Sequence, residues 1–183
     1  MNSILEQTLC ELEKTQHDFW NISRSTGNFL NMLIKMAGCK SGLEIGTSNG
    51  YSGLWLGTAF KDNGGKMTTI EFWEKRQVIA REHFKNCGLN EVITPVIGPA
   101  TEILEQWNEE LDFVFIDANK GQYIEFFNLV DKHLQKGGII AADNITSHAE
   151  KVKPFVDAIK SNPNYQVEIL DLPAGLLLAY KKN

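Results

Sequence analysis

The sequence predicts an α/β protein with a doubly wound, mostly parallel sheet of seven strands and extra helices at the N-terminus. Between residues 41 and 161, five short apolar runs alternate with longer amphipathic segments, a pattern typical of consecutive strand-helix units. Near the C-terminus, two strand-like runs are separated by only three residues, too few for a crossover helix. These last two strands are therefore expected to pair in antiparallel fashion.

Apolar side chains in the first 40 residues recur at the spacing of amphipathic helices. They are Ile4, Leu5, Leu9 and Leu12, and then Phe29, Leu30, Leu33, Ile34 and Ala37. Two helices are expected, joined by a connection over residues 18–24, and Gly38 is expected to end the second. The connection carries the adjacent aromatic residues Phe19 and Trp20, which either cover a binding pocket or pack against a second subunit.

The rest of the chain alternates between strands and helices. Strands are expected over residues 43–46, 67–72, 92–97, 113–116 and 139–142, and helices over residues 50–60, 74–87, 100–107, 122–134 and 148–161. The two final strands, residues 165–172 and 176–182, flank the turn Pro173-Ala174-Gly175. Because no linker divides the sequence, residues 1–183 are expected to form one domain, with N-terminal helices at 1–40 and the sheet at 41–183.

The composition excludes several classes of protein. Of 183 residues, 43% are hydrophobic and 22% are charged, which excludes a disordered or coiled-coil chain. The formal net charge of -5 argues against binding of nucleic acid through phosphate neutralisation, so a small molecule is the expected partner. Three widely spaced cysteines fit neither a disulfide framework nor a cysteine-rich zinc site. With no basic N-terminal segment and no apolar stretch of about 18 residues, a cytoplasmic protein that does not span the membrane is expected.

The turn after the first expected strand contains Gly46 and Gly50 in a G-x-x-x-G arrangement. Dinucleotide-binding turns show G-x-G-x-x-G instead, in which the middle glycine lets the backbone approach a pyrophosphate. The wider spacing here, together with the polar side chains of Ser48 and Ser52, suits a ligand that presents a carboxylate and an amine, such as S-adenosylmethionine. A cluster of ordinary turn glycines is the alternative interpretation.

Glu71 ends the second expected strand and is followed by Phe72. A carboxylate at this position can accept hydrogen bonds from both ribose hydroxyls of a nucleoside, and an adjacent aromatic ring can cover one face of adenine. Both residues therefore fit an adenosine, whereas each alone also fits a side chain that simply faces solvent.

Polar side chains also follow the fourth and fifth expected strands. Asp117 ends the fourth strand, with Lys120 three residues later, and Asp143 and Asn144 end the fifth. Neighbouring parallel strands would bring Asp117, Asp143 and Asn144 to one point with oxygen ligands only, a set that prefers a hard divalent cation. Mg²⁺ is expected first, with Ca²⁺ or Mn²⁺ as alternatives. Loop-forming Asp and Asn residues with a surface lysine are the other interpretation.

Four stretches together resemble the cation-dependent, S-adenosylmethionine-dependent O-methyltransferases, the group that contains catechol and caffeoyl-CoA O-methyltransferases. They are L-E-I-G-T at residues 43–47, G-Y-S at 50–52, F-I-D-A-N-K at 115–120, and G-G-I with D-N between 137 and 144. The resemblance runs from about Ser23 to the C-terminus. It implies the class I methyltransferase fold, a Rossmann-like cofactor-binding core in which the final hairpin places an antiparallel strand in the sheet.

The resemblance also implies a role for individual residues. Asp117, Asp143 and Asn144 would bind the metal ion, and Lys120 would be the general base, with Asp117 also at the catalytic centre. Residues on the cofactor would be Glu44, Gly46, Ser48 and Ser52 at the methionine end, Glu71 and Phe72 at the ribose and adenine, and Gly98, Pro99, Ala100, Asp117 and Ala118 nearby. Relatives of this kind are commonly dimers, so a homodimer is expected.

The sequence departs from the family pattern at Asn119, where Asp is frequent, and at Lys136, where Pro is common. Neither change removes a proposed ligand. The segment at residues 145–148 and the N-terminal region are both short, although relatives build much of the acceptor pocket from them. An open or partner-completed pocket is therefore expected, one that is permissive towards small aromatic acceptors with vicinal hydroxyls.

The resulting hypothesis is methyl transfer from S-adenosylmethionine to a hydroxyl of a small, catechol-like aromatic molecule, with a divalent cation chelating the vicinal hydroxyls. Two alternatives stay open: an S-adenosylmethionine-binding protein that is non-catalytic or differently specific, and an NAD(P)-dependent oxidoreductase, which the glycine spacing disfavours.

Overall fold

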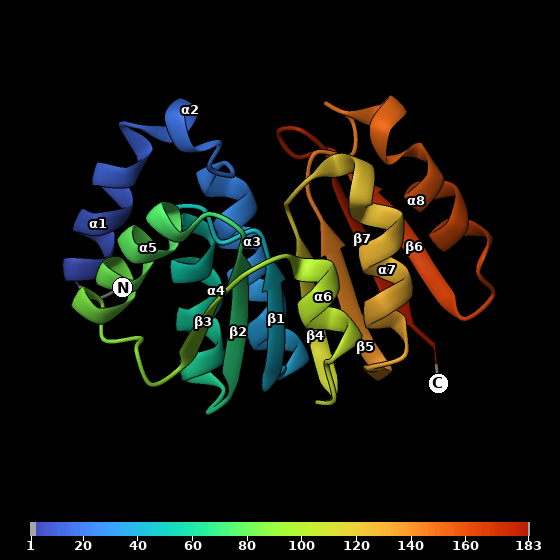
Figure 1. The fold of residues 1–183 in the computed structure, drawn as a ribbon, viewed down its shortest axis with the longest axis horizontal. Helices are drawn as coiled ribbons and strands as arrows, with labels where there is room; N and C mark the ends of the chain where they lie inside the picture. Colours follow the sequence, from blue (N-terminus) through green and yellow to red (C-terminus); the bar gives the residue numbers. More distant parts are fainter. Residues whose placement is uncertain (1–2, 183) are drawn as a thin grey trace.

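The computed structural model describes residues 3–182 and contains one seven-stranded sheet with helices on both faces (Figure 1). The strand order is β3-β2-β1-β4-β5-β7-β6, in which β1 to β5 run parallel and β7 pairs antiparallel with both β5 and β6. The strands are β1 Ser41–Ile45, β2 Lys66–Glu71, β3 Ile93–Ile97, β4 Leu111–Ile116, β5 Leu134–Ala142, β6 Tyr165–Leu170 and β7 Leu176–Lys181. The predicted fold class, including the antiparallel hairpin, is confirmed.

The α-helices are α1 Ser3–Glu13, α2 Gln16–Phe19, α3 Arg24–Ala37, α4 Tyr51–Asp62, α5 Glu74–Asn86, α6 Ala100–Glu105, α7 Tyr123–Asp131 and α8 Ala149–Ser161. A 3-10 turn, η1 Lys120–Gln122, precedes α7. None of the helices within residues 3–182 is long and apolar enough to cross a membrane.

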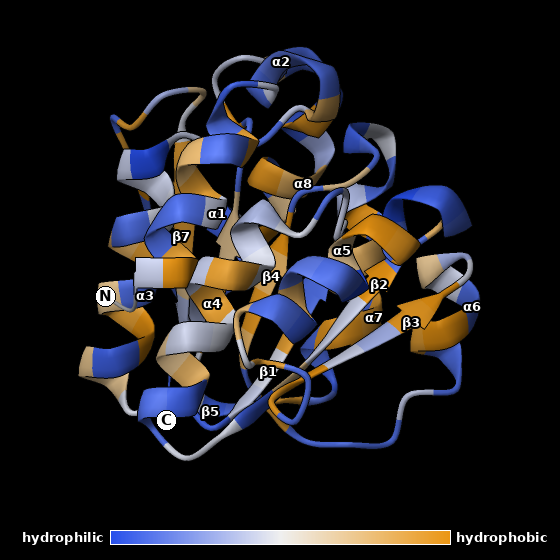
Figure 2. Cartoon of the chain, turned by 90° about the vertical axis from the view of Figure 1, so that its left-hand side faces the viewer, coloured by the Kyte–Doolittle hydropathy of each residue, from blue (hydrophilic) through white to orange (hydrophobic). Residues whose placement is uncertain are grey.

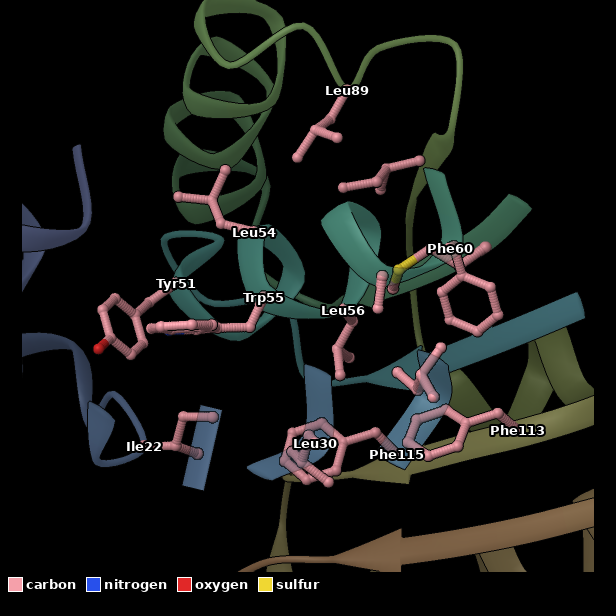
Figure 3. Packing of buried hydrophobic residues seen from close by; sticks show 14 of the residues in the cluster. Ile22, Leu30, Tyr51, Leu54, Trp55, Leu56, Phe60, Leu89, Phe113 and Phe115 are labelled. Carbon is pink, nitrogen blue, oxygen red and sulfur yellow. The ribbon is translucent and has the colours of Figure 1, made fainter. Parts of the chain in front are cut away.

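Side chains alternate between the two faces of the sheet and build a separate core on each. Phe113 and Phe115 of β4 pack with α1, α3, α4 and α5, whereas Val114 and Ile116 pack with α6, α7 and α8. Figure 3 shows α4 side chains packed over Phe113 and Phe115, and the rings of Phe60 and Phe113 meet edge to face at 6.2 Å. The strands carry mainly hydrophobic colours in Figure 2, while α1 alternates between hydrophobic and hydrophilic stretches.

The N-terminal region differs from the two helices expected. α1 ends at Glu13, and the short α2 follows across the boundary between the expected first helix and the expected connection over residues 18–24. The end of α1 is stabilised by Asn21, whose side-chain amide donates to the Leu12 carbonyl at 3.2 Å. Trp20 then adopts a left-handed conformation (φ 57°), and the Ser23 hydroxyl accepts from the Thr26 amide to begin α3.

The fifth strand also begins earlier than expected, at Leu134 instead of Ile139. The predicted helix over residues 122–134 is correspondingly too long, since α7 ends at Asp131. Leu134 pairs with Leu111 of β4, and the register then shifts before Ile139 pairs with Phe113. The irregularity places exposed residues 135–137 between the two paired parts, which hides the beginning of the strand in the apolar pattern.

Candidate active site

A cavity of about 570 Å³ lies at the carboxyl ends of β1, β2 and β4, and its wall includes residues 19–22 at the connection between α2 and α3. This is the edge at which open parallel sheets bind ligands. The predicted site residues on its wall are Gly46, Ser48, Ser52, Glu71, Phe72, Gly98, Pro99, Ala100, Asp117, Ala118 and Lys120. The cavity wall does not include Glu44, Asp143 or Asn144.

The glycine turn is held between the neighbouring strands β2 and β4. The Gly46 amide donates to the Ile70 carbonyl at 2.9 Å, and the Asp117 amide donates to the Ile45 carbonyl at 2.9 Å. Gly46 has φ 106°, and a Cβ atom there would lie 2.1 Å from the Asp117 carbonyl oxygen. Only glycine lets the turn approach the end of β4 so closely.

The Glu71 carboxylate is fixed by backbone amides on both of its oxygens. Its Oε2 accepts from the Ser48 amide at 2.7 Å, and its Oε1 accepts from the Trp73 amide at 3.0 Å. An ionised carboxylate has about four acceptor sites, so lone pairs remain for a ligand with two hydroxyls. The hydrogen bond from the Ser48 amide also ties Glu71 to the glycine turn, so a ligand that binds Glu71 also contacts that turn.

Glu44 is fully buried instead of facing the cavity as the sequence suggests. Its Oε2 accepts from the Thr69 hydroxyl at 2.5 Å, whereas its buried Oε1 has no hydrogen-bond partner among residues 3–182. Burial raises the pKa of Glu44 to about 7.

Asp117 and Lys120 meet at the end of β4. Lys120 Nζ lies 2.8 Å from Asp117 Oδ1, with both side chains largely buried. The lysine also lies 5.8 Å from the centre of the Tyr123 ring. An amine and a carboxylate thus stand together on the cavity wall, where a proton could be taken from a bound ligand.

Asp143 lies behind this pair at the end of β5 and is 3% exposed. Burial, followed by repulsion from Asp117, raises the pKa of Asp143 well above its usual range. Its Oδ1 has no hydrogen-bond partner among residues 3–182. A buried carboxylate oxygen that lacks a donor and faces a second carboxylate fits an oxygen-preferring cation.

Asn144 follows in a left-handed conformation (φ 64°), and its side-chain amide lies 3.4 Å from the Ser147 hydroxyl. The turn between β6 and β7 holds this loop, since the Ala174 carbonyl accepts from the amides of Thr146 and Ser147. Residues 3–182 contain no group of three or more His, Cys, Asp or Glu side chains placed to bind a metal ion. The predicted set has two carboxylates, so its third protein ligand would be the amide oxygen of Asn144.

Sequence reasoning missed one wall residue of distinct chemistry. Arg76, in the first turn of α5, lines the cavity, and its guanidinium carbon lies 4.7 Å from the centre of the Trp20 ring. In the sequence it belongs to the charged run Glu74-Lys75-Arg76, where nothing distinguishes it from a solvated surface residue. Phe19 and Trp20, for which two roles were open, both line the cavity.

Comparisons with known proteins agree with this geometry. A family model described as O-methyltransferase matches residues 1–182. A catechol O-methyltransferase from Niastella koreensis is 34% identical over 129 residues, which cover 68% of this chain and 58% of that protein. The chain thus spans less than two thirds of that relative. Caffeoyl-CoA O-methyltransferase 2 from Petunia hybrida is 33% identical over 183 residues, covering 85% and 74% of the two chains.

A solved structure of an O-methyltransferase from Bacillus cereus in complex with SAH superposes with a TM-score of 0.87 at 26% identity, covering 100% of this chain and 92% of that chain. Sequence and fold point to the same group of proteins, and the family model covers almost the whole chain. The chain belongs to the O-methyltransferase family.

Proposed function

We propose that this protein transfers the methyl group of S-adenosylmethionine to a hydroxyl of a small, catechol-like aromatic acceptor, with a divalent cation at the site. The observation that carries the proposal is one cavity lined by both the Glu71-glycine turn unit and the Asp117–Lys120 pair. The names of the relatives, catechol and caffeoyl-CoA O-methyltransferase, favour a vicinal-hydroxyl aromatic as the acceptor class.

The cofactor half of the cavity would hold the donor in a fixed orientation. Glu71 would accept hydrogen bonds from the ribose hydroxyls, because its carboxylate is already aimed by two amides. Ser48 and Ser52 would contact the methionine end, and Phe72 would cover the adenine near Gly98, Pro99, Ala100 and Ala118. Fixing the donor in this way would place its reacting methyl carbon on the side of the cavity where Asp117 lies.

The residues at the ends of β4 and β5 fit a divalent cation, which Asp117, Asp143 and Asn144 would hold. Mg²⁺ is the first choice, because the set contains only oxygen ligands. When bound, such an ion supplies Lewis-acid chemistry that favours the ionised form of a hydroxyl. The carboxylate oxygen of Asp143 that lacks a donor supports this placement.

In its neutral amine form, Lys120 would receive the proton of the acceptor hydroxyl at its Nζ, and the resulting oxygen would attack the methyl carbon in line with the departing sulfur. The 2.8 Å contact with Asp117 Oδ1, to which the neutral amine can also donate a hydrogen bond, orients Nζ at the wall of the cavity. Phe19 and Trp20, which also line the cavity, would restrict water around the reacting atoms.

Methyl-transfer assays with catechol-type acceptors, in the presence and absence of EDTA, test the proposal. We expect EDTA to abolish turnover, and Asp143→Ala to abolish it while calorimetric binding of S-adenosylhomocysteine stays largely intact. Asp157→Ala, an exposed carboxylate of α8, is the matched control and should retain activity. Undiminished turnover in EDTA would refute the metal ion, and S-adenosylhomocysteine binding without any methylation would favour a non-catalytic binding protein.

We further propose a homodimer located in the cytoplasm that acts without nucleic-acid or membrane partners. The net charge of -5 supports the absence of a nucleic-acid partner. Met32 and Met36 of α3 are exposed, which gives a candidate apolar surface for a second subunit. Mass measurement by size-exclusion chromatography with light scattering tests the dimer, and a monomer at micromolar concentration would refute it.

A further inference from the structure

Residues 19–22, which we call the strap, form one part of the cavity wall and touch the glycine turn at Ser48. Most of the strap is fixed to the N-terminal helices. Asn21 exchanges hydrogen bonds with Gln16, and the Ile22 side chain is buried in the core. The Phe19–Trp20 end is different, since Trp20 is 75% exposed and has φ 57°, an uncommon conformation for a residue other than glycine.

Two contacts connect this exposed end to the cofactor half of the cavity. The Phe19 carbonyl accepts a hydrogen bond of 2.9 Å from the Ser48 hydroxyl, on the glycine turn. The Arg76 guanidinium, on α5, lies 5.8 Å from the Phe19 ring and 4.7 Å from the Trp20 ring. Both contacts join residues of the cavity wall, so they must break for the strap end to move away from the glycine turn and α5.

Arg76 is committed to aromatic rings. A third ring, that of Trp73, lies 5.8 Å from its guanidinium, and no carboxylate within residues 3–182 forms an ion pair with it. Trp73 also donates its amide to Glu71, the residue expected at the ribose. The aromatic rings, the Arg76 guanidinium and the Glu71 carboxylate therefore form one continuous group on the cavity wall.

We propose that Arg76 is a positioning residue that holds Phe19 and Trp20 over the bound cofactor and thereby limits the rate at which the cofactor product leaves. This inference rests on the proposed function, because it takes S-adenosylhomocysteine as the product. A ligand between Glu71 and the strap leaves when Arg76 separates from the two strap rings. Each exposed cation-ring contact of this kind changes a rate by about twofold to fivefold.

The test is the dissociation rate of radiolabelled S-adenosylhomocysteine, measured by rapid filtration after a chase with unlabelled ligand. Arg76→Met loses the two cation-ring contacts to Phe19 and Trp20, which is expected to raise this rate by about fivefold to thirtyfold. Trp20→Ala should raise it by part of that factor, and Arg76→Lys, which keeps the cation, should restore part of the slow release. Lys75→Met, the exposed neighbour on α5, is the matched control and should leave the rate unchanged.

Single-turnover methyl transfer with saturating cofactor separates positioning from general damage. Arg76→Met should raise the dissociation rate by a larger factor than it lowers the single-turnover rate, since the residue acts on retention of the ligand. Equal dissociation rates in Arg76→Met and Lys75→Met would overturn the role of Arg76 while leaving the proposed function intact. Arg76-dependent release without methyl transfer would overturn the proposed function alone, and absence of S-adenosylhomocysteine binding in the unmodified protein would overturn both.

Discussion

Replacing Gly46 by alanine tests the close approach of the glycine turn to the end of β4. Two costs add at this position. An alanine at φ 106° is strained by about 1–3 kcal/mol, because its Cβ atom disfavours that conformation. The new Cβ atom would also lie 2.1 Å from the Asp117 carbonyl oxygen, a backbone atom that cannot rotate away, and such overpacking costs roughly 1–3 kcal/mol.

The expected loss in the free energy of unfolding is therefore about 4 kcal/mol, a large fraction of the roughly 5–15 kcal/mol of an ordinary domain. Gly64→Ala is the matched control. Gly64 has φ 70°, a region that alanine tolerates better, and a Cβ atom there would meet no atom within 4 Å. That variant should lose only about 1 kcal/mol, which is the conformational cost alone.

Urea unfolding followed by far-ultraviolet circular dichroism measures both variants, and calorimetry measures their affinity for S-adenosylhomocysteine. Gly46→Ala should be about 3 kcal/mol less stable than Gly64→Ala and should bind the ligand more weakly, because Ser48 moves with the turn. The reasoning is refuted if the two variants unfold within about 0.5 kcal/mol of each other, since crowding against Asp117 would then contribute nothing.

Three other expectations concern charge and packing. Because the pKa of Glu44 is raised to about 7 in the folded protein, its contribution to stability is full below about pH 4.5 and is lost as pH rises towards 7. Between pH 4 and pH 8, the free energy of unfolding of Glu44→Gln should therefore rise by roughly 3 kcal/mol relative to that of the unmodified protein. Urea unfolding at the two pH values measures this difference. A pH-independent difference would contradict this. Glu71→Gln should weaken S-adenosylhomocysteine binding roughly tenfold to a hundredfold in calorimetry, whereas metal binding should stay unchanged. Phe155→Ala should cost about 3–5 kcal/mol in urea unfolding, since this fully buried ring packs edge to face against Tyr123 and Phe127; a loss below about 1 kcal/mol would show that the site collapses.

The sheet could be predicted from the sequence because buried parallel strands consist of continuous apolar residues, as in Phe113–Ile116. The break between α1 and α2 could not, because it depends on a side-chain bond from Asn21 to the Leu12 carbonyl. The spacing of apolar residues along the sequence carries no information about such a hydrogen bond. The beginning of β5 was missed for a similar reason, since polar residues interrupt its apolar pattern at the register shift.

The candidate site was predictable where one rule applied, namely that ligands bind at the carboxyl ends of parallel strands. That rule placed Glu71 and Asp117 on the cavity wall. Glu44 was expected on the wall because the family resemblance implied it, and neither the resemblance nor the rule separates a strand residue that faces the cavity from one that is buried. Arg76 depends on three aromatic rings from two distant segments, so only the tertiary structure reveals it.

Strain and buried charge are concentrated at the edge of the sheet where ligands would bind. Within residues 3–182, the non-glycine residues with positive φ are Trp20, Ser48, Asn144 and Ala174, and each borders the cavity or supports the loop after β5. Burial raises the pKa of Glu44 and Asp143 at the same edge. Each such feature costs stability in the protein without ligands, and the two apolar cores on the faces of the sheet must offset that cost. Residues selected for stability alone would not produce this distribution, so the arrangement is best explained by the binding of charged ligands at this edge.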